Sequence, residues 1–188
     1  MADQQHQPTD PTGPEFDPDS GLEQPDGLLQ AMIQRIEGEI QALQFPSFNQ
    51  ADALNLGLML VNFGTSRSLP IAIDIRREGH VLFHASLPGA TPDNELWVAK
   101  KSRTAARYCE PSLLVGLRGR VGGGRVEDNQ WFDQSRYAAH GGAFPLYVKG
   151  TGAVATVTVS GLPQVADHKL VVEALAAYLE QAAGTGAG

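Results

Sequence analysis

The 188-residue sequence contains a single cysteine, Cys109, and no long apolar run. One cysteine cannot form an intramolecular disulfide, and no CxxC or CxxH spacing suggests structural zinc. No stretch approaches the roughly 18 apolar residues that a membrane-spanning helix needs. The first 21 residues contain no basic segment and no apolar segment, so we expect no secretory signal. We therefore expect a cytoplasmic protein with no membrane partner.

Positive charge is also scarce. The chain has 14 Lys and Arg against 21 Asp and Glu, a formal net charge of −7. Nucleic-acid binding depends on neutralising phosphates with basic side chains, so we expect no nucleic-acid partner. Hydrophobic residues make up 42% of the chain, which is enough for one globular core.

The two ends of the chain differ from its middle. Residues 1–26 are rich in Pro, Asp and Gln and have almost nothing apolar to bury, which predicts a disordered acidic tail. The small residues at 183–188 predict a shorter flexible tail. Residues 27–182 are therefore expected to form a single domain.

Helices are expected where apolar residues recur at spacings of three and four. This pattern covers 28–44 and 164–182, while Pro46 must end the first helix. A helix over about 50–65, with Asn49 as N-cap, is apolar nearly all round and should be buried, inside the domain or in a subunit interface. Another helix should span about 94–108, capped by Asp93 or Asn94.

Two hairpins are expected between these helices. The first spans residues 69–87 and turns at Glu78-Gly79, and the second combines "AFPLYVKG" with "GAVATVTVSG". "SLLVGLR" reads as either a strand or a short helix. Since hairpins replace βαβ crossovers, the expected fold is α/β of the α+β kind: an antiparallel sheet of two hairpins covered by helices.

The basic helix "ELWVAKKSRTAAR" carries the first candidate site. Lys100, Lys101 and Arg103 could form a ridge that recognises an anionic ligand, with Trp97 as a stacking wall. The same residues also suit a solvated helix whose lysine stems cover apolar surface.

A second candidate is His140, which precedes Gly141 and Gly142. The glycines allow positive φ and close backbone approach, so the histidine stands on a sharply directed corner. It could face a ligand, or fill the corner by bonding a carbonyl. Further on, Asp167 and His168 open the last helix: Asp167 suits the helix dipole, and His168 could be a ligand or pH-sensitive group.

Three segments together resemble a known family: "PDNELWVAKKSRTAAR", "YAAHGGAFPLYVKGTGAVATVTVSGLP" and "ADHKLVVEAL". They are similar to the haem-degrading domain family, in its uncharacterised branch of GlcG-like and HbpS-like proteins, over about residues 28–182. The resemblance implies a profilin-like arrangement, symmetric homo-oligomers, and haem binding or degradation.

For this sequence the resemblance implies a haem site. His140, or less readily Cys109, would approach the iron; Lys100, Lys101 and Arg103 would meet the propionates. Members of this branch often carry a histidine where this chain has Cys109-Glu110, and a thiolate could itself ligate iron.

The function hypothesis is therefore a homo-oligomeric small-molecule-binding domain whose ligand is haem or another planar anion. The alternative is a non-catalytic oligomeric scaffold or partner-binding protein. No complete catalytic constellation is present, so no enzymatic activity is assigned. A metal-dependent hydrolase is disfavoured, because no ligand triad has workable spacing.

Overall fold

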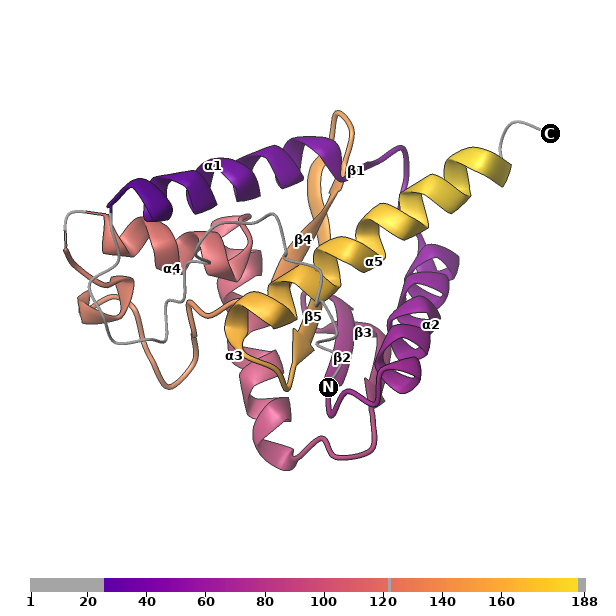
Figure 1. The fold of residues 1–188 in the computed structure, drawn as a ribbon, viewed down its shortest axis with the longest axis horizontal. Coiled ribbons are helices and arrows are strands. Elements are labelled where there is room, and N and C mark those ends of the chain that lie inside the picture. Colours follow the sequence, from indigo (N-terminus) through magenta and orange to yellow (C-terminus); the bar gives the residue numbers. More distant parts are fainter. Residues whose placement is uncertain (1–25, 122, 186–188) are drawn as a thin grey trace, which may run out of the picture.

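The computed structural model describes residues 26–121 and 123–185, which form five α-helices, a short 3-10 helix and five strands (Figure 1). In chain order these are α1 Asp26–Ala42, β1 Gln44–Phe45, α2 Gln50–Ser66, β2 Ala72–Arg77, β3 His80–Ser86, α3 Pro92–Tyr108, α4 Ser112–Arg120, η1 Val126–Asp128, β4 Ala143–Val148, β5 Gly152–Ser160 and α5 Gln164–Thr185.

The strands form one sheet in the order β1-β4-β5-β2-β3. Both expected hairpins are present, and β5 joins β2 in antiparallel fashion. The expectation of a purely antiparallel sheet is wrong at one edge, where β1 runs parallel to β4. No pattern in the sequence predicted β1, because two residues are too few to show an alternating pattern. Phe45 is 1% exposed and anchors β1 in the core.

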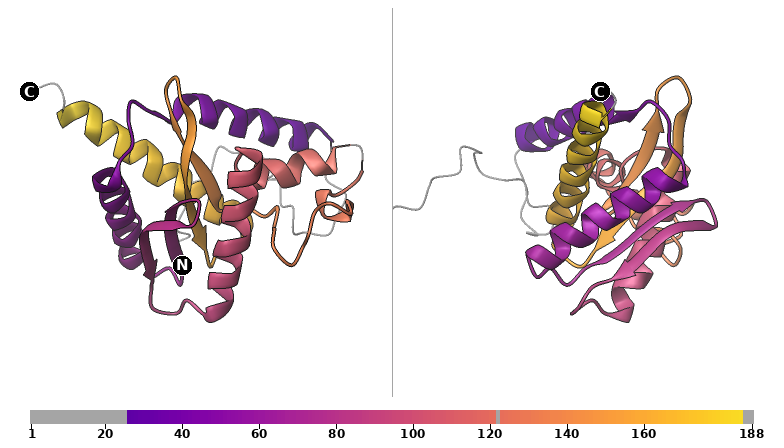
Figure 2. Two further views of the ribbon diagram at one scale, coloured as in Figure 1. Left: turned by 180° about the vertical axis from the view of Figure 1, so that it is seen from behind. Right: turned by 90° about the vertical axis from the view of Figure 1, so that its right-hand side faces the viewer.

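The two faces of the sheet differ in chemistry. α2 and α5 cover one face, which carries the main apolar core including Ile73, Val157 and Val159 (Figure 2). α3 covers the other face, where Asp74 and Thr158 are fully buried. Side chains alternate along a strand, so β2 and β5 supply apolar residues to the face covered by α2 and α5 and polar residues to the face covered by α3.

Several helix boundaries differ from those expected. α1 ends at Ala42 because the chain enters β1, and "SLLVGLR" is helical, packing its leucines on α1. α5 continues to Thr185, so the predicted tail is wrong for residues 183–185, which are helical. Asp26 begins α1, and the rest of the predicted tail over 1–26, like 186–188, lies outside the described residues.

α2 confirms its predicted cap, and in the single chain only one of its sides is buried. The Asn49 side chain accepts hydrogen bonds from the N–H groups of Ala51 and Asp52. Leu56 and Leu60 are fully buried, whereas Leu54 and Leu58 are 50% and 52% exposed. One side of α2 therefore packs on the sheet and the opposite side leaves leucines uncovered in the single chain.

α3 begins two residues earlier than expected. Pro92 is its first residue and Thr91 its N-cap, since proline suits the first helical position. Neither Asp93 nor Asn94 is the N-cap, but Asn94 is the third residue of a capping box, in which its side chain accepts the Thr91 N–H at 2.7 Å. Within the described segments no helix is both long enough and apolar enough to cross a membrane.

Candidate functional site

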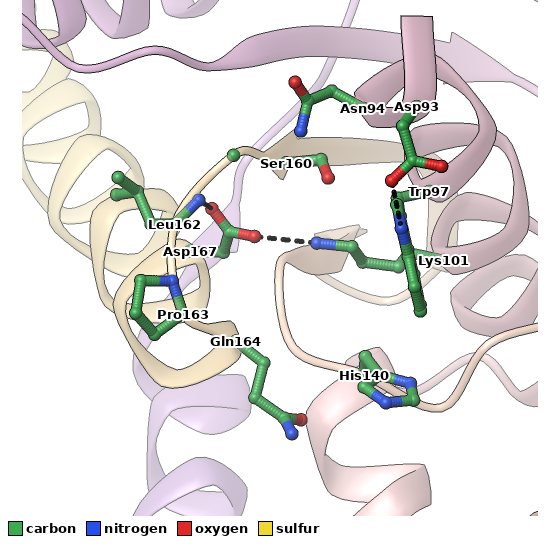
Figure 3. Close-up of a pocket in the computed structure, with 11 residues that line it drawn as sticks. Asp93, Asn94, Trp97, Lys101, His140, Ser160, Leu162, Pro163, Gln164 and Asp167 are labelled. Carbon is green, nitrogen blue, oxygen red and sulfur yellow. Dashed lines mark hydrogen bonds and ion pairs between the residues drawn. The ribbon is translucent and has the colours of Figure 1, made fainter. Parts of the chain in front are cut away.

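A cavity of about 260 Å³ lies between α3, the end of β5 and the start of α5 (Figure 3). Half-buried Trp97 and His140 stand at its rim, and buried Lys101, Gln164 and Asp167 stand inside it. The remaining lining residues are Asp93, Asn94, Ser160, Gly161, Leu162 and Pro163. It therefore brings together Trp97 and Lys101 of α3 and His140 of the His-Gly-Gly corner.

Trp97 and His140 form the exposed edge of the cavity. Their ring centroids are 5.1 Å apart and the rings meet at 68°, an edge-to-face contact. The indole N–H of Trp97 donates to Asp93 Oδ2 at 2.9 Å, which fixes the indole ring one helical turn from Asp93. Nδ1 of His140 is buried.

Hydrogen bonds to the backbone of three successive residues, His140, Gly141 and Gly142, hold the corner that presents the imidazole. The His140 carbonyl accepts from Ser112 Oγ at 2.5 Å, and the Gly141 N–H donates to Gln164 Oε1 at 3.2 Å. The Gly142 carbonyl accepts from the Val159 N–H at 2.9 Å. The imidazole thus stands on a backbone that is bonded to α4, α5 and β5.

Both glycines are required, as expected. Gly142 has φ +123°, and a Cβ there would lie 2.3 Å from the Val159 carbonyl oxygen. A Cβ on Gly141 would lie 2.1 Å from the Gln164 carbonyl oxygen. The backbone of the corner approaches its neighbours more closely than any side chain allows.

Lys101 corrects the prediction of an exposed basic ridge. It is 3% exposed, and its ammonium donates to Asp167 Oδ2 at 2.7 Å. Burial lowers the pKa of Lys101 and raises that of Asp167, while each partner's charge opposes the shift of the other. Asp167 is therefore not simply a residue that suits the helix dipole: it is the buried partner of Lys101.

Lys100 and Arg103 lie outside the cavity, next to the loop that leads to His140. Arg103 is exposed and donates to the Arg136 carbonyl at 3.3 Å. Hydrogen bonds from Ser135, and more weakly the charges of Arg136 and Lys100, lower the pKa of the Asp133 carboxyl. The predicted ridge is thus divided, with one lysine inside and two basic groups outside.

His168 and Cys109 do not line the cavity. His168 is 3% exposed, and its Nε2 lies 2.9 Å from Glu39 Oε2 on α1. Cys109 is exposed at the end of α3, with φ 51°, and lines a separate groove of about 660 Å³. The structure therefore does not bring Cys109 to the His140 site, and His168 serves the packing of α1 on α5.

Sequence reasoning missed the contribution of the segment from Ser160 to Gln164. Its signal was present in "SGLPQ", because Gly161 and Pro163 mark a turn just before a helix. Among the described residues, no group of three or more His, Cys, Asp or Glu side chains could hold a metal ion.

Comparisons with known proteins find relatives in sequence and in fold. The family model described as "Haem degrading protein HbpS-like" matches residues 48–176. A UPF0303 protein of Streptomyces avermitilis is 50% identical over 147 residues, covering 78% of this chain and 90% of the relative. The crystal structure of Ybr137w protein superposes with a TM-score of 0.74 at 28% identity, covering 84% of this chain and 96% of that one.

A more distant solved structure, the PduOC:Heme complex, has a TM-score of 0.60 at 19% identity and covers 70% of this chain and 94% of that one. At this identity the likeness concerns the fold.

Proposed function

The chain belongs to the HbpS-like family of haem-degrading proteins, and from this premise we propose that it binds haem through His140. The observation that carries the proposal is the fixed presentation of the imidazole beside Trp97 at the cavity rim. Histidine is a common protein ligand of haem iron, and an aromatic wall suits a planar ligand.

His140 and Trp97, which line the cavity, would hold the haem at the rim and not enclosed within the cavity. A volume of about 260 Å³ is below the roughly 300–1,000 Å³ of pockets that enclose drug-sized ligands. Lys100 and Arg103 lie on the same helix as Trp97 and would meet the propionates, or the acidic groups of another planar anion. When bound, haem would supply a redox-active iron, while the chain's own residues bind and orient it.

The test is a titration of the purified protein with haemin, followed by absorption spectroscopy. We expect a saturable one-to-one Soret shift, and in His140→Ala a loss of affinity at least as large as the roughly 10- to 100-fold loss caused by removing a partner that orients a metal ligand. His80→Ala is the matched control, because His80 is exposed on β3 and does not line the cavity. Equal titrations for His140→Ala and His80→Ala would remove His140 from the site.

If haemin binds, a second experiment tests whether the protein degrades haem. The haem-loaded protein would be incubated with a reductant and oxygen, and loss of the Soret band would be followed over time. Loss in the wild type that slows in His140→Ala would support degradation at this site, whereas a stable band would restrict the function to binding.

We also propose that the chain forms homo-oligomers through α2. Support comes from Leu54 and Leu58, which are about half exposed on the side of α2 that faces away from the sheet. Uncovered leucines side by side on one helix are typical of a protein interface.

The alternative function is an oligomeric scaffold without a small ligand, and it would become the preferred proposal if haemin failed to bind. The free, exposed Cys109 supports the proposal of a reducing, cytoplasmic setting.

A further inference from the structure

We propose that Lys101 and Asp167 are positioning residues that hold the His140 corner in its ligand-facing geometry. The inference rests on the proposed role of His140, but it concerns two residues that would not themselves touch the ligand. It replaces the expectation that Lys101 meets an anionic group of haem.

The Lys101 ammonium makes three hydrogen bonds inside the protein. A lysine ammonium has three N–H donors. Nζ lies 2.7 Å from Asp167 Oδ2 (Figure 3). It also lies 2.8 Å from the Gly141 carbonyl oxygen and 3.1 Å from the Val159 carbonyl oxygen. All three donors are therefore used inside the protein, and none remains for a ligand.

These three acceptors belong to three different segments that meet at the cavity. Gly141 is the residue next to His140, Val159 lies near the end of β5, and Asp167 lies in the first turn of α5. Asp167 also accepts the Leu162 N–H through Oδ1 at 3.0 Å, which holds the β5–α5 connection. One ion pair thus joins α3, the His140 corner and the start of α5.

Packing makes the arrangement rigid. A Cβ on Gly142 would lie 2.8 Å from Lys101 Nζ and 3.0 Å from Asp167 Cβ, so the ion pair contacts the turn directly. Both side chains are nearly solvent-free, at 4% and 2% exposed. A charged pair in such a place is costly to desolvate, and apolar residues of similar volume often replace it without loss of stability. Apolar residues could not, however, donate the hydrogen bond that Lys101 Nζ donates to the Gly141 carbonyl.

A variant that keeps the packing but lacks the hydrogen bond to Gly141 therefore tests the positioning role. Lys101→Met alone leaves a buried, unpaired Asp167 and is expected to unfold more readily. The informative protein is the double variant Lys101→Met/Asp167→Leu, which keeps the volume but removes the bond to the corner. Lys149→Met is the control, because Lys149 is exposed in the β4–β5 turn.

Three readouts are compared in wild type, double variant and control. Thermal unfolding followed by circular dichroism reports folding. The imidazole resonances of His140, assigned by their loss in His140→Ala, report whether the ring keeps one environment. Haemin affinity reports the site. We expect cooperative unfolding of the double variant, shifted and averaged His140 resonances, and a loss of haemin affinity of about 10- to 100-fold. The control should match the wild type.

Two results would overturn the inference. One is a folded double variant whose His140 resonances match those of the wild type. The other is a double variant that does not unfold cooperatively, since the pair would then be needed for the fold itself. Failure of haemin to bind the wild type would refute the proposed function instead, and the His140 resonances would still test the positioning role.

Discussion

Four glycines allow the His140 corner to be tested with one small change, glycine to alanine. Gly142 combines a positive φ of +123° with a carbonyl oxygen 2.3 Å from any added Cβ. Gly141 has the close contact alone, at 2.1 Å from the Gln164 carbonyl oxygen. Gly150 has positive φ alone, at +75°, with nothing within 4 Å, and Gly79 has neither. The four sites separate backbone strain from steric contact.

The expected losses of unfolding free energy follow from these two costs. Positive φ costs a residue with a Cβ about 1–2 kcal/mol, which predicts the loss for Gly150→Ala. Inserting a methyl group into a packed site costs about 1–3 kcal/mol, which predicts the loss for Gly141→Ala. Gly142→Ala bears both costs, so about 2–5 kcal/mol is expected. Gly79→Ala should remain within about 0.5 kcal/mol of the wild type.

The assay is equilibrium unfolding in urea, with haemin titration of each variant that remains folded. Only the two corner variants should lose haemin affinity, since Gly150 and Gly79 lie in the turns of the hairpins. If Gly142→Ala were no less stable than Gly150→Ala, the contact with the Val159 carbonyl would carry no energy. The description of the corner as a rigid support for His140 would then be wrong.

Two further predictions concern the α2–α5 side of the molecule. Burial, assisted by the hydrogen bond to Asp52, raises the pKa of Tyr178 to about 12 from 10.0. A raised pKa contributes stability that is complete below pH 10 and is lost as the pH rises to about 12, so melting temperatures should fall less steeply over this range in Tyr178→Phe. Sedimentation should show smaller species for Leu54→Ser/Leu58→Ser than for the wild type. Leu96→Ser, at a leucine 61% exposed on α3, is the control, and equal sizes for both variants would exclude α2 as the interface.

Local patterns in the sequence determined most of the elements. Apolar spacing of three and four identified α1 and α5, alternation identified the hairpins, and Asn49 identified the start of α2. The two glycines after His140 indicated the sharp corner, which the positive φ of Gly142 confirms. Each of these features depends on residues close together in the chain, so a pattern within one segment is sufficient to predict it.

The tertiary structure alone decided what the charged residues do. Lys100 and Lys101 are neighbours of the same type, yet one is half-buried outside the cavity and the other pairs with Asp167, 66 residues away. Likewise Phe45 joins β4 across about a hundred residues of sequence, through a strand of two residues. The environment of each of these side chains depends on which surfaces are buried when distant segments of the chain pack together. That burial makes Lys101 a support of the His140 corner and leaves His140 itself at the rim.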